Sequence, residues 1–172
     1  FALMAEARRR GRITTLDVFA ADRKDMANVA GLLPNTDYFI PSIEEAQALS
    51  GLADKEDIGR HFIDLGVGCI VMTMGAEGAY YHHRDGTRLH MPAFDIDVVC
   101  TCGCGDAFNA GFATGLIKGM NPEETMRLAQ ASSALNASGL GSQAGVTDLE
   151  AALDFIRHTK VKGPAKVLQR VG

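Results

Sequence analysis

The 172-residue chain is 47% hydrophobic and 22% charged, an ordinary globular composition that predicts a single domain over residues 1–172. Its net charge is −4, so no general basic field favours a nucleic-acid partner. Charged residues interrupt every hydrophobic run before it reaches the roughly 18 residues of a membrane span. Nucleic acid and membrane are therefore not expected partners, and a small anionic ligand would need a local site.

The opening residues, 1–10, have the amphipathic pattern of a helix that stops at Gly11. Because the chain starts inside this helix, with Phe1 rather than Met, we expect an N-terminal portion of the fold to be missing. Three arginines close the helix and Arg12 follows it. Cations are favoured at a helix C-terminus, so we interpret this basic cluster as a solvated helix end rather than a nucleic-acid patch.

Strands and helices alternate through the middle of the chain, which indicates an α/β fold. The run over 67–74 is almost continuously apolar, which is typical of a parallel strand that helices cover on both faces. The step from Asp85 to Gly86 favours a hairpin between two further strands. His82 and His83 alternate faces of their strand, so they are not expected to share a metal, and we place them at the surface. In chain order the patterns predict strands over 12–18 and 38–40, helices over 44–49 and 55–65, and strands over 67–74, 79–83 and 88–91.

The last third of the chain is predicted to be helical over 106–118, 122–137 and 148–158, with Pro122 in a first turn. Taken together, the elements predict a mostly parallel central sheet, with an antiparallel pair, flanked by helices. The four cysteines, three of them in a Cys-x-Cys-x-Cys run, do not form the framework of a small secreted protein. A reducing cytoplasm is therefore the expected compartment.

The most informative stretch begins at Val98, where an apolar strand is expected to pass through a glycine-rich turn into the helix at Asp106. Gly103 and Gly105 allow unusual dihedral angles and close backbone approach. The first turn of a helix presents unpaired N–H groups and partial positive charge, so this turn can bind an anion. Asp106 would lie beside that anion, within reach of an incoming hydroxyl, as phosphoryl transfer requires. The alternative is that Asp106 only stabilises the helix terminus, a contribution of about 0.3–1 kcal/mol.

The segment Thr101-x-Gly103-x-Gly105-Asp106 and the residues after it resemble the C-terminal signature of the ribokinase-like, PfkB-type carbohydrate kinases. The resemblance implies a Rossmann-like, three-layer fold of the ribokinase type, from which the N-terminal part and the substrate lid are absent. It implies that Asp106 is the catalytic base and that the amides of Gly103, Cys104 and Gly105 hold the transferring phosphate. Three other segments follow in the order of the family: 41–51, 71–78, and the helix over 129–139 with the glycine-rich loop after it.

The same resemblance implies that ATP and Mg²⁺ are cofactors and that Glu45 helps to hold the metal and its water shell. Ser42 and Glu45 also have the spacing of a helix capping box, and on spacing alone capping is the preferred interpretation. One carboxylate cannot fill both roles completely at once.

Four further residues resemble the nucleotide-contacting positions of the family, and each has a plain structural alternative. Thr73 and Gly75 lie at the carboxyl end of the most apolar strand, where open α/β sheets place ligand crevices, but they also make an ordinary strand exit. Gly78 completes that element. Asn136 resembles a residue of the adenine pocket, although Asn near the end of a helix is also a common cap.

Two positions depart from the family pattern. Cys100 stands where the family has an Asp, and a thiol is a poor ligand for a hard cation, so the monovalent-cation site of the family is doubtful here. Ser42 replaces the Asn of the family's Asn-x-x-Glu element. Zinc or an iron–sulfur cluster on the cysteine run is the less favoured alternative to buried, unligated thiols, because the usual Cys-x-x-Cys spacing is absent.

The sequence therefore predicts the ATP-binding portion of a kinase that transfers the γ-phosphoryl of MgATP to a hydroxyl of a sugar or nucleoside. The alternative is a nucleotide-binding module without catalysis. The identity of the sugar or nucleoside and the oligomeric state are left open, a homodimer being allowed.

Overall fold

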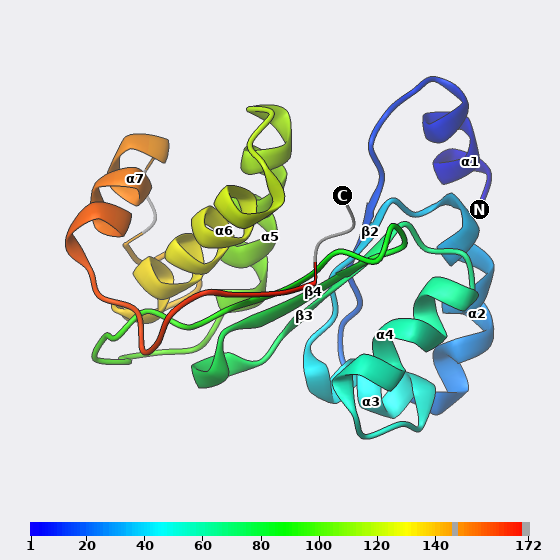
Figure 1. Ribbon diagram of the computed structural model, residues 1–172, viewed down its shortest axis with the longest axis horizontal. Coiled ribbons are helices and arrows are strands. Elements are labelled where there is room, and N and C mark those ends of the chain that lie inside the picture. The colour runs from blue at the N-terminus through cyan, green and yellow to red at the C-terminus, as the bar shows by residue number, and fades with distance from the viewer. Residues whose placement is uncertain (146–147, 170–172) are drawn as a thin grey trace. The chain divides into compact units, whose positions relative to one another are not determined.

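The computed structural model describes residues 1–145 and 148–169, which form six strands in one sheet, in the order β1-β2-β3-β4-β5-β6 (Figure 1). The strands are β1 Thr15–Leu16, β2 Tyr38–Phe39, β3 Cys69–Thr73, β4 Ala79–His83, β5 Arg88–Met91 and β6 Lys166–Gln169. The α-helices are α1 Ala2–Arg9, α2 Met26–Leu32, α3 Ile43–Ser50, α4 Lys55–Asp64, α5 Cys104–Ile117, α6 Pro122–Ala137 and α7 Leu149–His158, and 3-10 turns cover Arg23–Asp25, Leu33–Asn35 and Gly75–Glu77.

The described residues divide into two compact units. The first contains residues 1–74, 80–89 and 167–169, and the second contains 75–79, 90–145 and 148–166. The single domain expected from the sequence stays a prediction, and each unit is described by itself.

The first unit is built on three parallel strands. Thr15 of β1 pairs with Tyr38 of β2, which in turn pairs with Cys69 of β3. One face of these strands packs against α2, α3 and α4, and the rings of Phe39 and Phe62 meet edge-to-face with centroids 5.1 Å apart. The other face of β3 is also buried, as the continuous apolar run predicts. The buried side chains of this core are Val29, Leu33, Phe39, Ala46, Leu49, Ile58, Phe62, Val67, Ile70, Met72 and Tyr80.

The second unit contains α5, α6 and α7. Helices α5 and α6 approach closely at two glycines: a Cβ at Gly111 would lie 2.5 Å from Ser132 Oγ, and one at Gly115 would lie 2.9 Å from Thr125. Helix α6 begins with Pro122, as the sequence predicts, and the structure also shows a capping box of Asn121 and Glu124 at its start. The α/β fold class and the hairpin of β4 and β5 are confirmed.

The strand expected at Val98 is wrong. Val98 and Val99 are 59% and 58% exposed, and the chain there is extended but outside the sheet. The N–H groups of Val99 and Cys100 both donate to the carbonyl of Ala137, at 2.8 and 3.2 Å, so the end of α6 replaces a neighbouring strand as the partner. Helix α5 also begins at Cys104, two residues earlier than predicted.

The surface position expected for His82 is also wrong. Its side chain is only 3% exposed and packs against the backbone of α4 at Gly59, where no Cβ would fit. His83, on the other face of β4, is partly buried and lies 3.0 Å from Asp85. The alternation of faces was predicted correctly, but helix α4 covers one of them. Helix α2 and strand β6 were not predicted.

Candidate active site

The glycine-rich turn of the second unit leads directly into α5. Gly103 is the N-cap of this helix and has a φ of +72°, a left-handed conformation that favours glycine. A Cβ at Gly103 would also lie 2.6 Å from the carbonyl oxygen of Ser142. The N–H of Cys104 donates to the carbonyl of Thr101 at 3.2 Å, which closes the turn. Asp106 therefore occupies the third position of the helix, in its first turn.

The turn is open rather than sealed inside the protein. Gly105 and Asp106 are exposed, and a Cβ built at Gly105 meets no atom within 4 Å. Within the described part of the chain, the N–H groups of Gly103, Gly105 and Asp106 donate to no acceptor. Unengaged N–H groups and the positive end of a helix dipole are the features that favour binding of a small anion. The N–H of Cys104 is already engaged, so of the three amides expected to hold phosphate, two are available.

A side chain near the end of α6 holds the turn by hydrogen bonds. Asn136 is fully buried, and its Nδ2 donates to the carbonyl of Cys102 at 2.7 Å and to Cys104 Sγ at 3.6 Å. Its Oδ1 is buried and has no hydrogen-bond partner among the residues that the structure describes. Asn136 thus anchors the turn from α6, a contact that sequence spacing could not reveal.

Two hollows of the second unit are lined by residues at the start of α5. A hollow of about 510 Å³ is lined by Asp106, Ala107, Ala110, Asn136, Ser142 and Gln143. A mostly apolar hollow of about 380 Å³ is lined by Gly75, Ala76, Ala93, Phe94, Ile96, Val98, Thr101, Cys104, Gln130, Ser133, Ala134, Ala137 and Lys162. Gln130 is 7% exposed and was missed by the sequence analysis; the signal available was a large polar residue amid the small ones of α6. Apolar walls with a few polar groups are typical of small-molecule sites.

The nucleotide-contacting positions expected around β3 differ in their surroundings. Thr73 ends β3 in the first unit, and its N–H donates to the carbonyl of Pro41 at 3.1 Å. Gly75, with a φ of +52°, has no atom within 4 Å of a built Cβ and lines the apolar hollow. Gly78 is buried against the backbone of Met91 and Ala93 and has a φ of +96°, so its backbone is needed for the turn itself.

Glu45 caps helix α3 in the first unit, as the spacing predicts. Its Oε2 accepts from the N–H and the hydroxyl of Ser42, each at 2.9 Å, and Ser42 Oγ accepts from the N–H of Glu45 at 3.2 Å. The other carboxylate oxygen, Oε1, accepts from the N–H of Ala20 at 2.9 Å. Because both oxygens are engaged, the arrangement fits contact with Mg²⁺ through water better than direct ligation. Among residues 1–145 and 148–169, no cluster of three or more His, Cys, Asp or Glu could hold a metal.

The cysteine run is less buried than expected. Cys69 is buried, but Cys102 is exposed and Cys100 and Cys104 are partly exposed. Hydrogen bonds from the backbone N–H groups of Cys102 and Gly141 lower the pKa of the Cys100 thiol. The expectation of buried thiols was wrong here because no strand forms at Val98 to cover them.

Comparison with known proteins shows the family of this chain. Residues 1–149 match the profile of the pfkB family of carbohydrate kinases. The chain is 29% identical over 132 residues to a ribokinase of Haemophilus influenzae, covering 74% of this chain and 43% of that protein. It is 32% identical over 125 residues to a deoxyribokinase of Salmonella typhi, covering 70% and 40% respectively. The chain thus spans about two fifths of the length of these relatives.

Solved structures have the same fold. A ribokinase of Thermotoga maritima matches with a TM-score of 0.77 at 26% identity, covering 91% of this chain and 52% of that one. A ribokinase of Arabidopsis thaliana, solved with ribose and ATP, matches with a TM-score of 0.80 at 23% identity, covering 90% and 51%. No helix of the described residues is both long and apolar enough to cross a membrane. The ribokinase-like fold predicted from the sequence is confirmed, and the chain belongs to the pfkB family of carbohydrate kinases.

Proposed function

We propose that this chain forms the nucleotide-binding part of a kinase that transfers the γ-phosphoryl of ATP to a hydroxyl of a sugar or nucleoside. The observation that carries the proposal is the open turn at 103–105, with two unengaged amides and the exposed carboxylate of Asp106 on the same helix turn. The comparisons support sugar phosphorylation as the reaction class, because the named relatives are a ribokinase and a deoxyribokinase.

The amides of Gly103 and Gly105 would neutralise the charge on the transferring phosphoryl group. Phosphoryl transfer depends mainly on position and charge stabilisation, which fixed N–H groups provide without reorganisation. As the hydroxyl oxygen of the acceptor bonds to phosphorus, its proton passes to the carboxylate of Asp106. The bond from phosphorus to the β-phosphate oxygen breaks, and ADP leaves.

The apolar hollow next to the turn is the proposed site of the nucleotide base. Thr101 and Cys104 line this hollow and belong to the turn, so a base and its phosphates can reach both at once. Ala134 and Ala137 of α6 supply flat apolar contact, and Gln130 supplies an amide for an edge of the base. In this arrangement Asn136 acts by holding the turn, while Thr73 and Gly75 stay the proposed contacts at the end of β3.

Mg²⁺, when bound with ATP, supplies charge neutralisation at the phosphates and prefers to keep several of its waters. We propose that Glu45 holds one of those waters. We do not propose a monovalent-cation site at Cys100, since a thiol is a poor ligand for such ions.

The proposal is tested with the complete protein and a panel of sugars and nucleosides, by measuring ADP release and the phosphorylated product together. A Gly103→Val variant is the negative control, because a side chain at this position is strained at a φ of +72° and would collide with Ser142. We expect product with at least one acceptor from the parent protein and loss of both binding and transfer in the variant. Nucleotide binding without transfer to any acceptor would favour the non-catalytic module instead.

Replacing Glu45 with Gln separates capping from metal binding. If Glu45 holds a Mg²⁺-bound water, the Mg²⁺ concentration for half-maximal activity should rise, because an amide attracts that water less strongly. A purely capping role would change the free energy of unfolding only slightly, because Gln also fills this position of a capping box, and would leave the Mg²⁺ requirement unchanged. Glu124→Gln is the control, because Glu124 fills the same capping position in α6, where it accepts from the N–H of Asn121 at 3.0 Å.

A further inference from the structure

We propose that a basic pocket of the first unit binds a small anion that bears a phosphate group. The pocket has a volume of about 470 Å³ and lies at the amino-terminal edge of the parallel strands. Tyr38, which begins β2, and Gly68, which directly precedes β3, both line it. Ser42, in contrast, lies beyond the opposite end of β2, and Thr73 is the last residue of β3. None of the residues that line the pocket belongs to the candidate active site.

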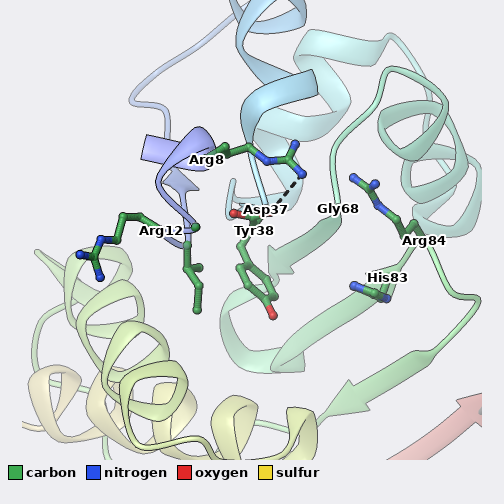
Figure 2. Close-up of a pocket in the computed structure, with 9 residues that line it drawn as sticks. Arg8, Arg12, Asp37, Tyr38, Gly68, His83 and Arg84 are labelled. Carbon is green, nitrogen blue, oxygen red and sulfur yellow. Dashed lines mark ion pairs between the residues drawn. The ribbon is translucent and has the colours of Figure 1, made fainter. Parts of the chain in front are cut away.

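Positive side chains converge on this pocket. Figure 2 shows the guanidinium groups of Arg8 and Arg84 directed toward each other from α1 and from the end of β4, with His83 and the Tyr38 ring on the side below. Arg12 also lines the pocket, but its guanidinium points away from these groups. The arginines come from segments far apart in the sequence, so the fold, and not a local charge run, brings them together.

The negative charge in the pocket is already engaged. Asp37 Oδ2 accepts from the N–H and the hydroxyl of Thr14, at 2.9 and 3.0 Å. Its Oδ1 lies 3.6 Å from Arg8 Nη2, while Arg8 Nη1 donates to the carbonyl of Pro34 at 2.6 Å. These contacts fix the Arg8 guanidinium in place and leave the arginines in excess over the single carboxylate.

The remaining groups suit an anion as well. Arg84 donates from Nη2 to the carbonyl of Gly66 at 3.2 Å, which positions its guanidinium at the rim. Burial raises the pKa of Tyr38, so near neutral pH its phenol carries no negative charge that would repel an anion. At Gly68 a Cβ would lie 2.7 Å from the carbonyl oxygen of Asp37, so only glycine allows the strands to meet at the pocket floor.

These features favour a compact phosphate ester over a nucleic acid. Two guanidinium groups offer planar sets of donors that match phosphate oxygens. The volume of the pocket suits a molecule of the size of a small metabolite. The pocket is a concave site and not an extended groove. The net charge of the chain is −4, so a long polyanion that extends beyond the pocket would be repelled by the rest of the protein.

The test uses this chain, with inorganic phosphate and glycerol 3-phosphate as probes and NMR of backbone amides as the readout. We expect the amide signals of Gly68 and Arg84 to shift on titration, beyond any effect of sodium chloride at equal ionic strength. Phosphate at the turn would instead shift Gly105, so the two sites are observed separately. Glycerol 3-phosphate binding more tightly than inorganic phosphate would identify an ester as the ligand class.

Arg84→Gln should raise the dissociation constant for the phosphate probe, measured from the Gly68 amide signal, about tenfold because a charge-assisted contact is lost. Arg60→Gln, an exposed arginine of the same unit that pairs with Asp57, should leave that constant unchanged. Arg8→Gln provides a second variant in case the hairpin is altered at residue 84. An unshifted Gly68 signal in the parent chain would overturn the proposal, as would equal binding in all variants or tighter binding of an oligonucleotide than of either probe.

Discussion

Replacing Asp106 with Asn in the complete protein should lower kcat for phosphoryl transfer by about 10²–10⁴-fold while ATP still binds. Asn is almost the same size and keeps the first turn of α5 in place, but its amide cannot accept the proton of the acceptor hydroxyl. The unengaged amides of Gly103 and Gly105 are unchanged, so the affinity for nucleotide should be similar or higher once a negative charge is removed. Steady-state kinetics and calorimetric titration with ATP measure the two quantities separately.

The control for this experiment is Asp148→Asn. Asp148 is another exposed helix-terminal carboxylate of the second unit, where it caps α7 by accepting from the N–H of Ala151 at 2.8 Å. It should affect stability slightly and leave kcat unchanged. Full turnover by the Asp106→Asn protein would show that Asp106 only stabilises its helix.

Acid should destabilise the first unit through His82. Burial, followed by the nearby charges of Arg88, Arg60 and His83, lowers the pKa of His82 to about 4 from its ordinary value of 6.5. The unfolded chain therefore binds a proton at this residue between pH 6.5 and 4, whereas the folded chain does not. The stabilisation is complete above pH 6.5 and is lost as the pH falls. Urea unfolding should give a free energy about 2–3 kcal/mol lower at pH 4.5 than at pH 7.5 from this residue alone.

Two variants isolate this contribution from that of the carboxylates. His82→Gln has no imidazole to protonate, so the difference in unfolding free energy between the two pH values should shrink. His158→Gln removes an exposed histidine near the end of α7 and should leave the difference as it is. NMR titration of the His82 ring gives its pKa directly, and a value near 6.5 in the folded protein would contradict the expectation.

The sequence predicted those elements whose pattern is local. The apolar run of β3, the capping box before α3, Pro122 in the first turn of α6, and the turn into α5 each occupy a few neighbouring residues, and the structure has all of them. Helix α2 was missed because it is short and contains Gly31, so its periodicity is weak. Strand β6 was missed because its residues are exposed and show no alternation.

The errors at Val98 and His82 have one physical origin: burial is decided by elements distant in the sequence. Val98 has the composition of a strand, yet the nearby backbone bonds to α6 instead of to the sheet. His82 is of a residue type that often lies at the surface, yet α4 covers it. The missing side chain of Gly59 leaves room for the His82 ring. The candidate site divides in the same way. Its glycines and Asp106 could be recognised from spacing, whereas the anchoring role of Asn136 and the position of Gln130 depend on how α5 and α6 pack.

The seam of glycines between α5 and α6 restricts how this region can vary. Asp106 is carried by α5 and the anchor of its turn by α6, so the spacing of the two helix axes determines how the carboxylate and the anchored backbone are aligned. At Gly111 even a methyl group would meet both the Ser132 hydroxyl and the Cα of Ala129, at 2.5 and 2.8 Å. The position of the turn therefore depends on a contact between the two helices that lies more than one helical turn away. Substitutions at the glycines of this contact should be tolerated as poorly as substitutions at residues that touch the reactants.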